Sequence, residues 1–421
     1  MKQNADILIQ DAAQLLIFAG GVGPRKGKEM GDPVVIENGA VAVHDGKIVA
    51  VGTTGDVKNS VSLLPDAQVI SARGKVVMPC FVDPHTHLVY GGTREGELIQ
   101  RLEGAEYLDI LAAGGGILST VRFTREASES ELLKKGQKLL DHFLRAGVGT
   151  VESKSGYGLD TETELKQLRV AHKLDDLHAV DVVHTFLGAH AFPPEYKNNR
   201  EAYVDLIVEE MLPRVAAEQL AEFCDVFCEQ SVFTVEQSRR ILEAGKRHGL
   251  KPKLHADEII PFGGAELAAV VGAVSADHLL QASDQGIADL ARAGVVAVLL
   301  PGTAFFLMKN NYAPARKMID AGVAIALSTD SNPGSSPTQA MNLILTLACL
   351  GMKMKPAEAL TAATINAAYA VDRGHLVGSL EVGKQADILI MDAPNYNYIP
   401  YHYGINLVET VFKKGKIVVS N

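Results

Sequence analysis

The stretch FVDPHTHLVYGGTRE, residues 81–95, places two histidines, His85 and His87, directly after a short apolar run. Side chains at positions i and i+2 of an extended segment point the same way, so both imidazoles can face one ion. A catalytic metal needs further nitrogen or oxygen ligands and keeps one position open for water or substrate. A lone histidine is more often a hydrogen-bonded core residue, so the pair needs support from elsewhere in the chain.

That support comes from other apolar runs that also end in ionisable residues. Six of the 13 histidines lie at such ends, where random placement would scatter them. The polar residues at these ends are His85, His87, Glu152, Lys154, Tyr157, His184, His190, His255, Glu258, His278 and Asp330. His255 and Asp330 can complete the ligand set of His85 and His87, provided that the runs are strands whose ends meet.

The segments that must position these residues alternate between short apolar runs and stretches with helical spacing, such as residues 129–147 and 235–249. The eight apolar runs are residues 76–83, 147–154, 179–188, 223–229, 251–257, 273–279, 295–300 and 323–330. Alternating strands and helices indicate parallel strands. Eight such repeats predict an α/β fold of the (β/α)8 barrel type, whose active site lies at the C-terminal strand ends. An open doubly wound sheet is the alternative, but its first strand usually leads into a glycine-rich turn, where this chain has HTH.

The two ends of the chain resemble each other. ADILI occurs at residues 5–9 and 386–390, and DGKIVAVG at 45–52 is echoed by KGKIVVSN at 414–421. Each echo of the second pair is a turn signal followed by β-branched residues, which is typical of a hairpin. We therefore expect residues 1–78 and 376–421 to form a small composite β-sandwich domain. The barrel, residues 79–375, would be inserted between them.

Composition indicates a globular protein, with 47% hydrophobic and 21% charged residues. The net charge of −10 and the lack of a long basic run argue against nucleic acid or a membrane surface as partner. Neither a signal peptide nor a membrane-spanning apolar run is visible.

The four cysteines do not form a disulfide framework. We expect a cytoplasmic protein with buried thiols at Cys224 and Cys228. A homodimer is expected only because dimers are the commonest homo-oligomers.

With HTH after the first strand, histidines after the fifth and sixth and an aspartate after the eighth, the chain resembles the metal-dependent amidohydrolase superfamily. The segments DPHTHLVYGGTRE, VESKSGYGL, FLGAHAFPPEY, HADE and STDSNPGSS are more closely similar to the imidazolonepropionase family. The resemblance covers essentially the whole chain. It implies hydrolysis of the cyclic amide C–N bond of 4-imidazolone-5-propanoate to N-formimino-L-glutamate, in histidine degradation. The substrate would be a small molecule that carries a carboxylate.

The resemblance also implies a metal held by His85, His87, His255 and Asp330. Binuclear relatives use a carboxylated lysine, often at the end of the fourth strand, and residues 223–229 contain none. We therefore predict one divalent metal ion per chain, with Zn²⁺ ahead of iron, and a supporting role for Lys154. Zinc lowers the pKa of its bound water to about 7 and stabilises an oxyanion.

Catalytic proton transfer is expected from Glu258, His278 and Asp330, although the division of acid and base roles among them stays open. A propanoate is best held by a guanidinium fork, which makes Arg94 the natural anchor, completed by Tyr157 and His190. A surface salt bridge of Arg94 with Glu95 or Glu97 is the alternative. The resemblance adds Asn332, Gly334, Ser335 and Glu258 to the substrate contacts.

Two other functions remain open at this point. An aminohydrolase that deaminates another nitrogen heterocycle would use nearly the same metal chemistry but release ammonia. A non-catalytic assembly protein of the same fold would have lost metal ligands, whereas all four positions are occupied here.

Overall fold

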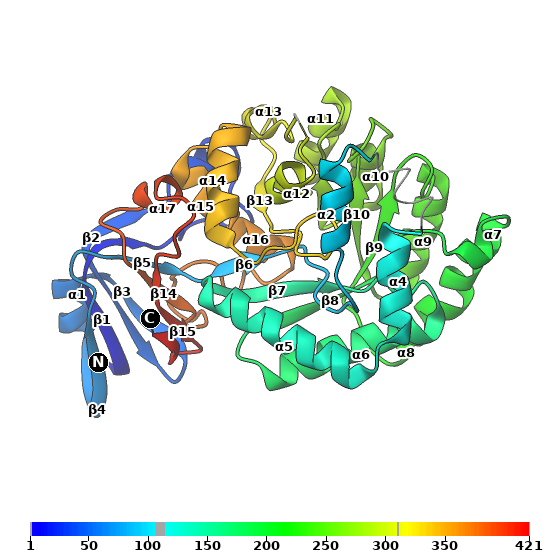
Figure 1. Ribbon diagram of the computed structural model, residues 1–421. Helices are drawn as coiled ribbons and strands as arrows, with labels where there is room; N and C mark the ends of the chain where they lie inside the picture. Colours follow the sequence, from blue (N-terminus) through cyan, green and yellow to red (C-terminus); the bar gives the residue numbers. More distant parts are fainter. Residues whose placement is uncertain (1, 106–113, 310, 421) are drawn as a thin grey trace.

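The computed structural model describes residues 2–105, 114–309 and 311–420. Eight parallel strands follow one another around a barrel in chain order (Figure 1). They are β6 (Phe81–Asp83), β7 (Val148–Lys154), β8 (Asp181–Ala189), β9 (Phe223–Cys228), β10 (Lys251–Ala256), β11 (Ser275–His278), β12 (Val296–Leu299) and β13 (Ile325–Leu327). A parallel bridge between Thr86 and Ser331 joins the two edge strands, and Asp83 accepts hydrogen bonds from Ser328 and Thr329. The barrel is therefore nearly closed, which confirms the predicted fold class.

Helices surround the barrel and cover its outer face. They are α2 (Glu95–Leu102), α4 (Ile117–Glu126), α5 (Glu129–Arg145), α6 (Thr161–Leu177), α7 (Arg200–Leu206), α8 (Leu212–Ala217), α9 (Val235–Arg247), α10 (Gly264–Val271), α11 (Asp284–Ala293), α12 (Pro301–Phe306), α13 (Ala315–Asp320), α14 (Met341–Met352), α15 (Pro356–Ala362) and α16 (Ile365–Ala370). A π-helical turn, Ile207–Met211, links α7 to α8, and short 3-10 helices span Gly27–Gly31 and Pro194–Tyr196. No helix in the described ranges is both long and apolar enough to cross a membrane.

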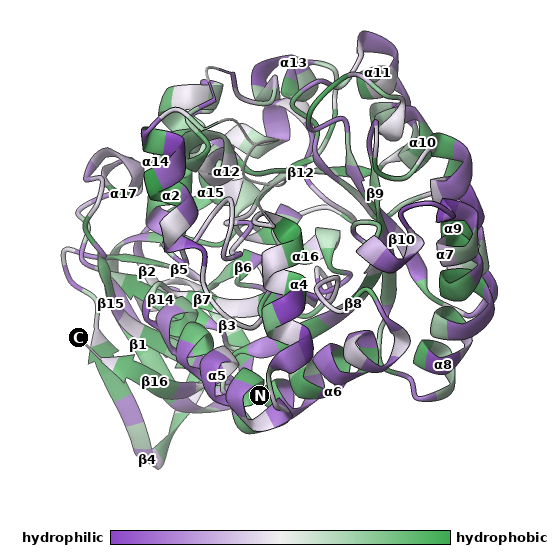
Figure 2. Ribbon diagram, turned by 45° about the vertical axis from the view of Figure 1, so that its right-hand side comes forward, coloured by the Kyte–Doolittle hydropathy of each residue, from purple (hydrophilic) through white to green (hydrophobic). Residues whose placement is uncertain are grey.

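Helix α5 shows how the sequence specifies this outer layer. Ser128 and Glu131 form a capping box at its start, and Leu132, Leu140 and Phe143 bury one side against the barrel. Figure 2 shows the hydrophilic residues of α5 alternating with hydrophobic ones along the ribbon, as an amphipathic helix requires.

Helix α16 lies against the barrel at the end where the barrel strands begin. Val82, Val298 and Ala326 from the strands pack against Ala367 and other small residues of this helix. The barrel interior is therefore packed below the strand ends. Its functional side chains lie at the opposite end, where the strands terminate.

Both ends of the chain build one mixed sheet beside the barrel, as the blue and red strands of Figure 1 show. Its strands are β1 (Gln3–Leu16), β2 (Val35–His44), β3 (Lys47–Thr53), β4 (Val61–Ser71), β5 (Val76–Pro79), β14 (Ile388–Met391), β15 (Val408–Lys413) and β16 (Lys416–Ser420), with α1 (Thr54–Ser60) and α17 (Tyr398–Tyr401) beside them. Asp45 and Gly46 both have positive φ, as do Lys414 and Gly415, so both predicted hairpins form with matching turns. The residues at which the two domains divide stay a prediction.

The prediction of one continuous strand over residues 76–83 was wrong. These residues form two strands in different sheets: β5 ends at Pro79, and β6 begins at Phe81. The chain changes partners at this point: the Cys80 N–H donates to Asp387, whereas the Phe81 N–H donates to Gly147 of the barrel. A continuous apolar run carries no signal for such a change of sheet.

Candidate metal centre

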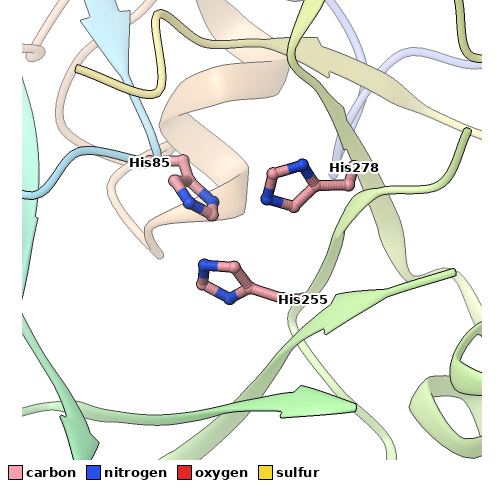
Figure 3. A group of neighbouring side chains, drawn as sticks. All are labelled: His85, His255 and His278. Atoms are coloured by element: carbon pink, nitrogen blue, oxygen red, sulfur yellow. The ribbon is translucent and has the colours of Figure 1, made fainter. Parts of the chain in front are cut away.

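The C-terminal ends of the barrel strands bring the predicted histidines together. His85 and His87 follow β6, His255 lies near the end of β10, and His278 ends β11. The ring centroid of His85 lies 4.5 Å from that of His255, 5.4 Å from His278 and 5.5 Å from His87. All four side chains are buried. Figure 3 shows His85, His255 and His278 directed toward one another from three separate segments.

Two carboxylates at the base of this cluster orient two of the rings. Nδ1 of His85 lies 2.6 Å from Oδ2 of Asp277, and Nδ1 of His255 lies 3.1 Å from Oδ1 of Asp225. An ionised carboxylate only accepts, so each Nδ1 carries the hydrogen and each Nε2 keeps its lone pair. Both Nε2 atoms are buried and have no hydrogen-bond partner among the described residues. An imidazole whose other nitrogen donates to a carboxylate is the usual arrangement of a metal ligand.

Asp330 supplies the carboxylate of the cluster. Its Oδ1 lies 3.6 Å from Nε2 of His85 and 3.8 Å from Nε2 of His87, while its Oδ2 accepts a 2.6 Å hydrogen bond from Thr303. The φ of Asp330 is 52° and that of His278 is 75°, in a backbone region that side chains other than glycine rarely adopt. Backbone strain of this kind persists where surrounding contacts enforce it, and it gathers at functional sites.

The ligand atoms fall into three overlapping groups that could each hold a metal ion. These groups are His85, His255 and His278; His87, His190 and His255; and His85, His87 and Asp330. Within each group the ligand atoms lie within 4.8 Å of one another. The four predicted ligands thus belong to one cluster of overlapping groups, and His278 and His190 lie close enough to contribute.

Burial controls the charge state of the cluster. It lowers the pKa of His85, His87 and His278 well below the ordinary value, with neighbouring positive groups adding to the effect. Burial also acts to lower the pKa of His255, but the Asp225 carboxylate outweighs it and holds this pKa above the ordinary value. In the metal-free protein, burial raises the pKa of Asp330 to about 7. Neutral imidazoles and a nearby carboxylate are the forms that bind a divalent cation.

Tyr157 and His190 lie beside His87, at one side of the cluster. The His190 ring stacks on that of His87 with centroids 4.9 Å apart, and the Tyr157 ring lies 5.3 Å from each of them. Nδ1 of His190 donates to the carbonyl of Gly156 at 3.1 Å, which leaves its Nε2 as an acceptor. Burial lowers the pKa of His190 to about 3, so the ring is neutral at physiological pH.

Arg94 lies at the start of α2 and pairs with Glu97, one of the two partners considered for a surface salt bridge. Nη2 of Arg94 is 2.7 Å from Oε2 of Glu97, but both side chains are largely buried, at 11% and 14% exposure. The guanidinium rests on Gly334, where a Cβ atom would come within 2.0 Å of Nη1. Nε of Arg94 is buried without a partner in the described chain. This guanidinium belongs to the interior of the site rather than to the surface.

Asn332 and Ser335 shape the loop that follows β13. The Asn332 amide nitrogen donates to the Asp330 carbonyl at 2.7 Å and to the Ser335 hydroxyl at 2.9 Å. Its amide oxygen accepts from the N–H groups of Gly334 and Ser335, each at 2.8 Å. Both ends of this amide are therefore occupied within the loop, and a direct bond to a substrate would have to replace one of them.

Glu258 approaches the cluster from the loop after β10. Its Oε2 lies 3.6 Å from Nδ1 of His278, and burial raises its pKa. Oε2 of Glu229 accepts the N–H of Ile259 at 2.8 Å, which fixes this loop beside the histidines. A carboxyl group with a raised pKa next to an imidazole can take up and return a proton.

Sequence reasoning missed the residues that support the ligands from below. Asp225 and Asp277 orient the histidines, and Thr303 holds Asp330. The available signal was the placement of ionisable residues inside apolar runs, as in FCDVFC and KPKLHAD, because a buried charge requires a partner.

Comparisons with known proteins agree with this geometry. The model of the amidohydrolase family matches residues 76–418. An imidazolonepropionase of Geobacillus sp. (strain WCH70) is 57% identical over 417 residues, 99% of this chain and 98% of the relative. One of Alkaliphilus metalliredigens (strain QYMF) is 56% identical over 414 residues, 98% of each chain.

Among solved structures, a zinc-bound adenosine deaminase from Xanthomonas campestris superposes with a TM-score of 0.72 at 21% identity, over 100% of this chain and 94% of that one. Guanine deaminase of E. coli gives a TM-score of 0.74 at 13% identity, over 98% and 99% of the two chains. These likenesses show the fold alone, whereas the matches of sequence show the family. The chain belongs to the metal-dependent amidohydrolase family and, within it, to the imidazolonepropionases.

Proposed function

We propose that this chain hydrolyses 4-imidazolone-5-propanoate to N-formimino-L-glutamate with one divalent metal ion, held by His85, His87, His255 and Asp330. The observation that carries the proposal is the identity of 57% over nearly the whole chain to an imidazolonepropionase. It is combined with a cluster of imidazole nitrogens around Asp330 that lack hydrogen-bond partners among the described residues. Hydrolysis bonds a water oxygen to the ring carbonyl carbon, breaks the ring C–N bond and places a proton on the leaving nitrogen.

The donor set fits a metal ion. Nε2 of His85 and of His255 are buried and without a hydrogen-bond partner among the described residues, and Asp330 offers Oδ1 beside Nε2 of His85. Metal binding would displace the proton from Nε2 of His255, whose pKa Asp225 holds above the ordinary value. When bound, a divalent ion acidifies a water molecule and polarises a carbonyl group. Three imidazoles and a carboxylate suit zinc and iron alike, and we favour zinc.

The fourth barrel strand supports one metal ion rather than two. Binuclear relatives often carry a bridging carboxylated lysine at the end of this strand, whereas β9 (Phe223–Cys228), with the sequence FCDVFC, contains no lysine.

Lys154 is also unsuited to the carboxylation that binuclear relatives use. Burial acts to lower its pKa, but Asp225, Glu152 and Asp277 outweigh burial and hold that pKa above the ordinary value. Lys154 therefore stays an ammonium ion, and an amine must lose its proton before it can act as a nucleophile.

The proton transfers fall to three carboxyl and imidazole groups. Asp330 offers Oδ1 to the ion, and its Oδ2, which accepts from the Thr303 hydroxyl, keeps a further lone pair that can take a proton from the attacking water. Glu258 lies beside His278 and is the better placed of the two carboxylates to deliver a proton to the leaving ring nitrogen. Nδ1 of His278 lies 3.6 Å from Glu258 but makes no hydrogen bond in the described chain, so the ring can hydrogen-bond the carbonyl oxygen.

The propanoate of the substrate is assigned to Arg94, Tyr157 and His190. Arg94 offers a buried Nε that has no hydrogen-bond partner among the described residues, and its Nη1 lies against Gly334. A guanidinium binds a carboxylate through two parallel hydrogen bonds. Asn332 and Ser335 contribute by shaping the loop that holds Gly334 against Arg94.

Product analysis separates this function from deamination. Incubation of the metal-loaded protein with fresh 4-imidazolone-5-propanoate is expected to remove the ultraviolet absorbance of the ring without releasing ammonia. Ammonia released from purines or pyrimidines, with the imidazolone left intact, would contradict the proposal.

A further inference from the structure

Five charged side chains lie packed together inside the barrel, beneath the histidines. Lys154 and Lys253 provide two ammonium groups, and Glu152, Asp225 and Asp277 provide three carboxylates, all with 0% exposure. Taking such charges out of water costs several kcal/mol for each ion unless pairing and hydrogen bonds compensate. Such an array beside a functional site can hold the side chains above it in fixed positions.

Lys154 is the member of this array that contacts both carboxylates, Asp225 and Asp277, that face a histidine ring. Its Nζ lies 2.7 Å from Oδ2 of Asp225, 3.5 Å from Oδ2 of Asp277 and 2.9 Å from Oε2 of Glu152. The two aspartates come from β9 and β11, the strands on either side of β10, and each accepts the Nδ1 hydrogen of one histidine. One ammonium group therefore links the partners of His85 and His255.

The oxygens of Asp225 are divided between the two contacts. Oδ1 accepts the backbone N–H of His255 at 3.2 Å and faces the His255 ring nitrogen at 3.1 Å, while Oδ2 takes Lys154. Removal of the ammonium would free Oδ2 and leave Asp225 and Asp277 as uncompensated like charges. Either carboxylate could then turn away from its histidine, and Nδ1 of that ring would lose the acceptor that fixes its orientation.

We propose that Lys154 is a positioning residue for the metal site, because it fixes Asp225 and Asp277 so that His255 and His85 both present Nε2 to one ion. The inference rests on the proposed metal ligands. It assigns to this lysine a function in metal affinity that is separate from direct ligation and from lysine carboxylation.

Lys253 provides a matched comparison within the same array. Its Nζ lies 2.7 Å from Oε1 of Glu152 and donates to the carbonyls of Pro84 and Ala370 at 3.2 and 3.3 Å. Among the described residues, no ion pair joins it to Asp225 or Asp277. The charge of Lys253 acts on Asp277 from a distance, but loss of Lys253 removes an equally buried ammonium group without breaking an ion pair to either carboxylate that orients a histidine.

The test measures zinc binding to the metal-free protein by competition with a chromogenic chelator, together with the ¹⁵N spectra of the histidine rings. Lys154→Met is expected to raise the zinc Kd about 10- to 100-fold, the range typical of residues that orient ligands, and to shift the ring nitrogen signals of His85 and His255. Lys253→Met is expected to change Kd by less than about threefold and to leave those signals in place. A native Kd and native ring signals in Lys154→Met would overturn the inference.

Charge-balanced variants cover the case in which Lys154→Met does not fold. Lys154→Met with Glu152→Gln removes one cation and one anion, as does Lys253→Met with Glu152→Gln. Only the first is expected to weaken zinc binding and shift the ring signals, and equal values for the two would contradict the inference. His85→Ala separates the two proposals. If its zinc Kd is native, the proposed ligand set fails, whereas if it is weakened while Lys154→Met is native, only the positioning function fails.

Discussion

At the residue scale, the site depends on polar atoms that are buried and still free to bind. Nε2 of His85 and of His255 and Nε of Arg94 have no partner among the described residues. A buried polar atom left unsatisfied costs about 1–3 kcal/mol, so such atoms persist where a ligand will satisfy them. We assign the imidazole nitrogens to a cation and the guanidinium to a carboxylate. These two contacts together would orient the substrate between the histidine cluster and Arg94.

Replacement of Arg94 by lysine tests the carboxylate anchor. Arg94→Lys keeps the charge but loses the planar fork, so KM for 4-imidazolone-5-propanoate should rise roughly tenfold, equivalent to about 1.4 kcal/mol of binding. The metal content should stay native, because Arg94 touches no proposed ligand. Steady-state kinetics over a range of substrate concentrations give the result, and an unchanged KM would remove Arg94 from the substrate site.

At the element scale, helix α6 holds the loop that carries Tyr157. The carboxylate of Glu164 is fully buried and accepts the N–H groups of Gly156, Gly158 and Leu159 at 2.8–2.9 Å. Gln167, one turn further on, donates to the carbonyl of Val89 at 2.7 Å. The loop after β7 and the segment after His87 are therefore fixed by side chains of one helix rather than by strand pairing.

Glu164→Gln should loosen this loop without disturbing the metal. An amide oxygen is a weaker acceptor than a carboxylate, and the amide nitrogen would face the backbone N–H groups that Glu164 now satisfies. We expect KM to rise about three- to tenfold, or by about 0.7–1.4 kcal/mol, with native zinc content. Glu162→Gln, an exposed position on the same helix, serves as the control and should leave KM unchanged. Equal KM values for the two variants would show that α6 does not position the loop.

The sequence allowed the proposed ligands to be picked out, but not the residues that orient them. His85, His87, His255 and Asp330 could be found because they follow apolar runs, and closure of the barrel then brings them together. The pairing of His85 with Asp277 depends on contacts across the barrel that no spacing encodes. The hydrogen bonds that Asn332 makes within its own loop could have been predicted from the sequence. An Asn-Pro-Gly-Ser segment is typical of a turn that the asparagine side chain closes.

At the scale of the whole molecule, stability depends on histidines that the fold keeps neutral. His184 in β8 stacks on His172 of α6 with ring centroids 3.8 Å apart, away from the metal centre. Burial, with a contribution from His172, lowers the pKa of His184 to about 3. Between pH 3 and 6.5 the unfolded chain therefore binds a proton at this position that the folded chain does not.

The free energy of unfolding should consequently rise with pH in this window through His184. Its contribution is about 1.4 kcal/mol per pH unit, because one proton is bound in the unfolded state alone. In His184→Leu this contribution is lost, so the native protein should gain stability relative to the variant as the pH rises from 4 to 6. Urea unfolding at several pH values measures the difference. Loss of packing shifts all values alike, so a pH-independent difference would show that His184 titrates normally in the folded protein.

The most direct test of the central claim is the rate of imidazolone hydrolysis measured against metal content on the same samples. Zinc added stepwise to the chelator-treated protein should restore the loss of ring absorbance in proportion, up to about one ion per chain. Asp330→Ala, prepared in parallel, should stay inactive at every zinc concentration, because it lacks both a ligand and a proton acceptor. Full activity of the metal-free protein, a requirement for two ions per chain, or native turnover by Asp330→Ala would contradict the account.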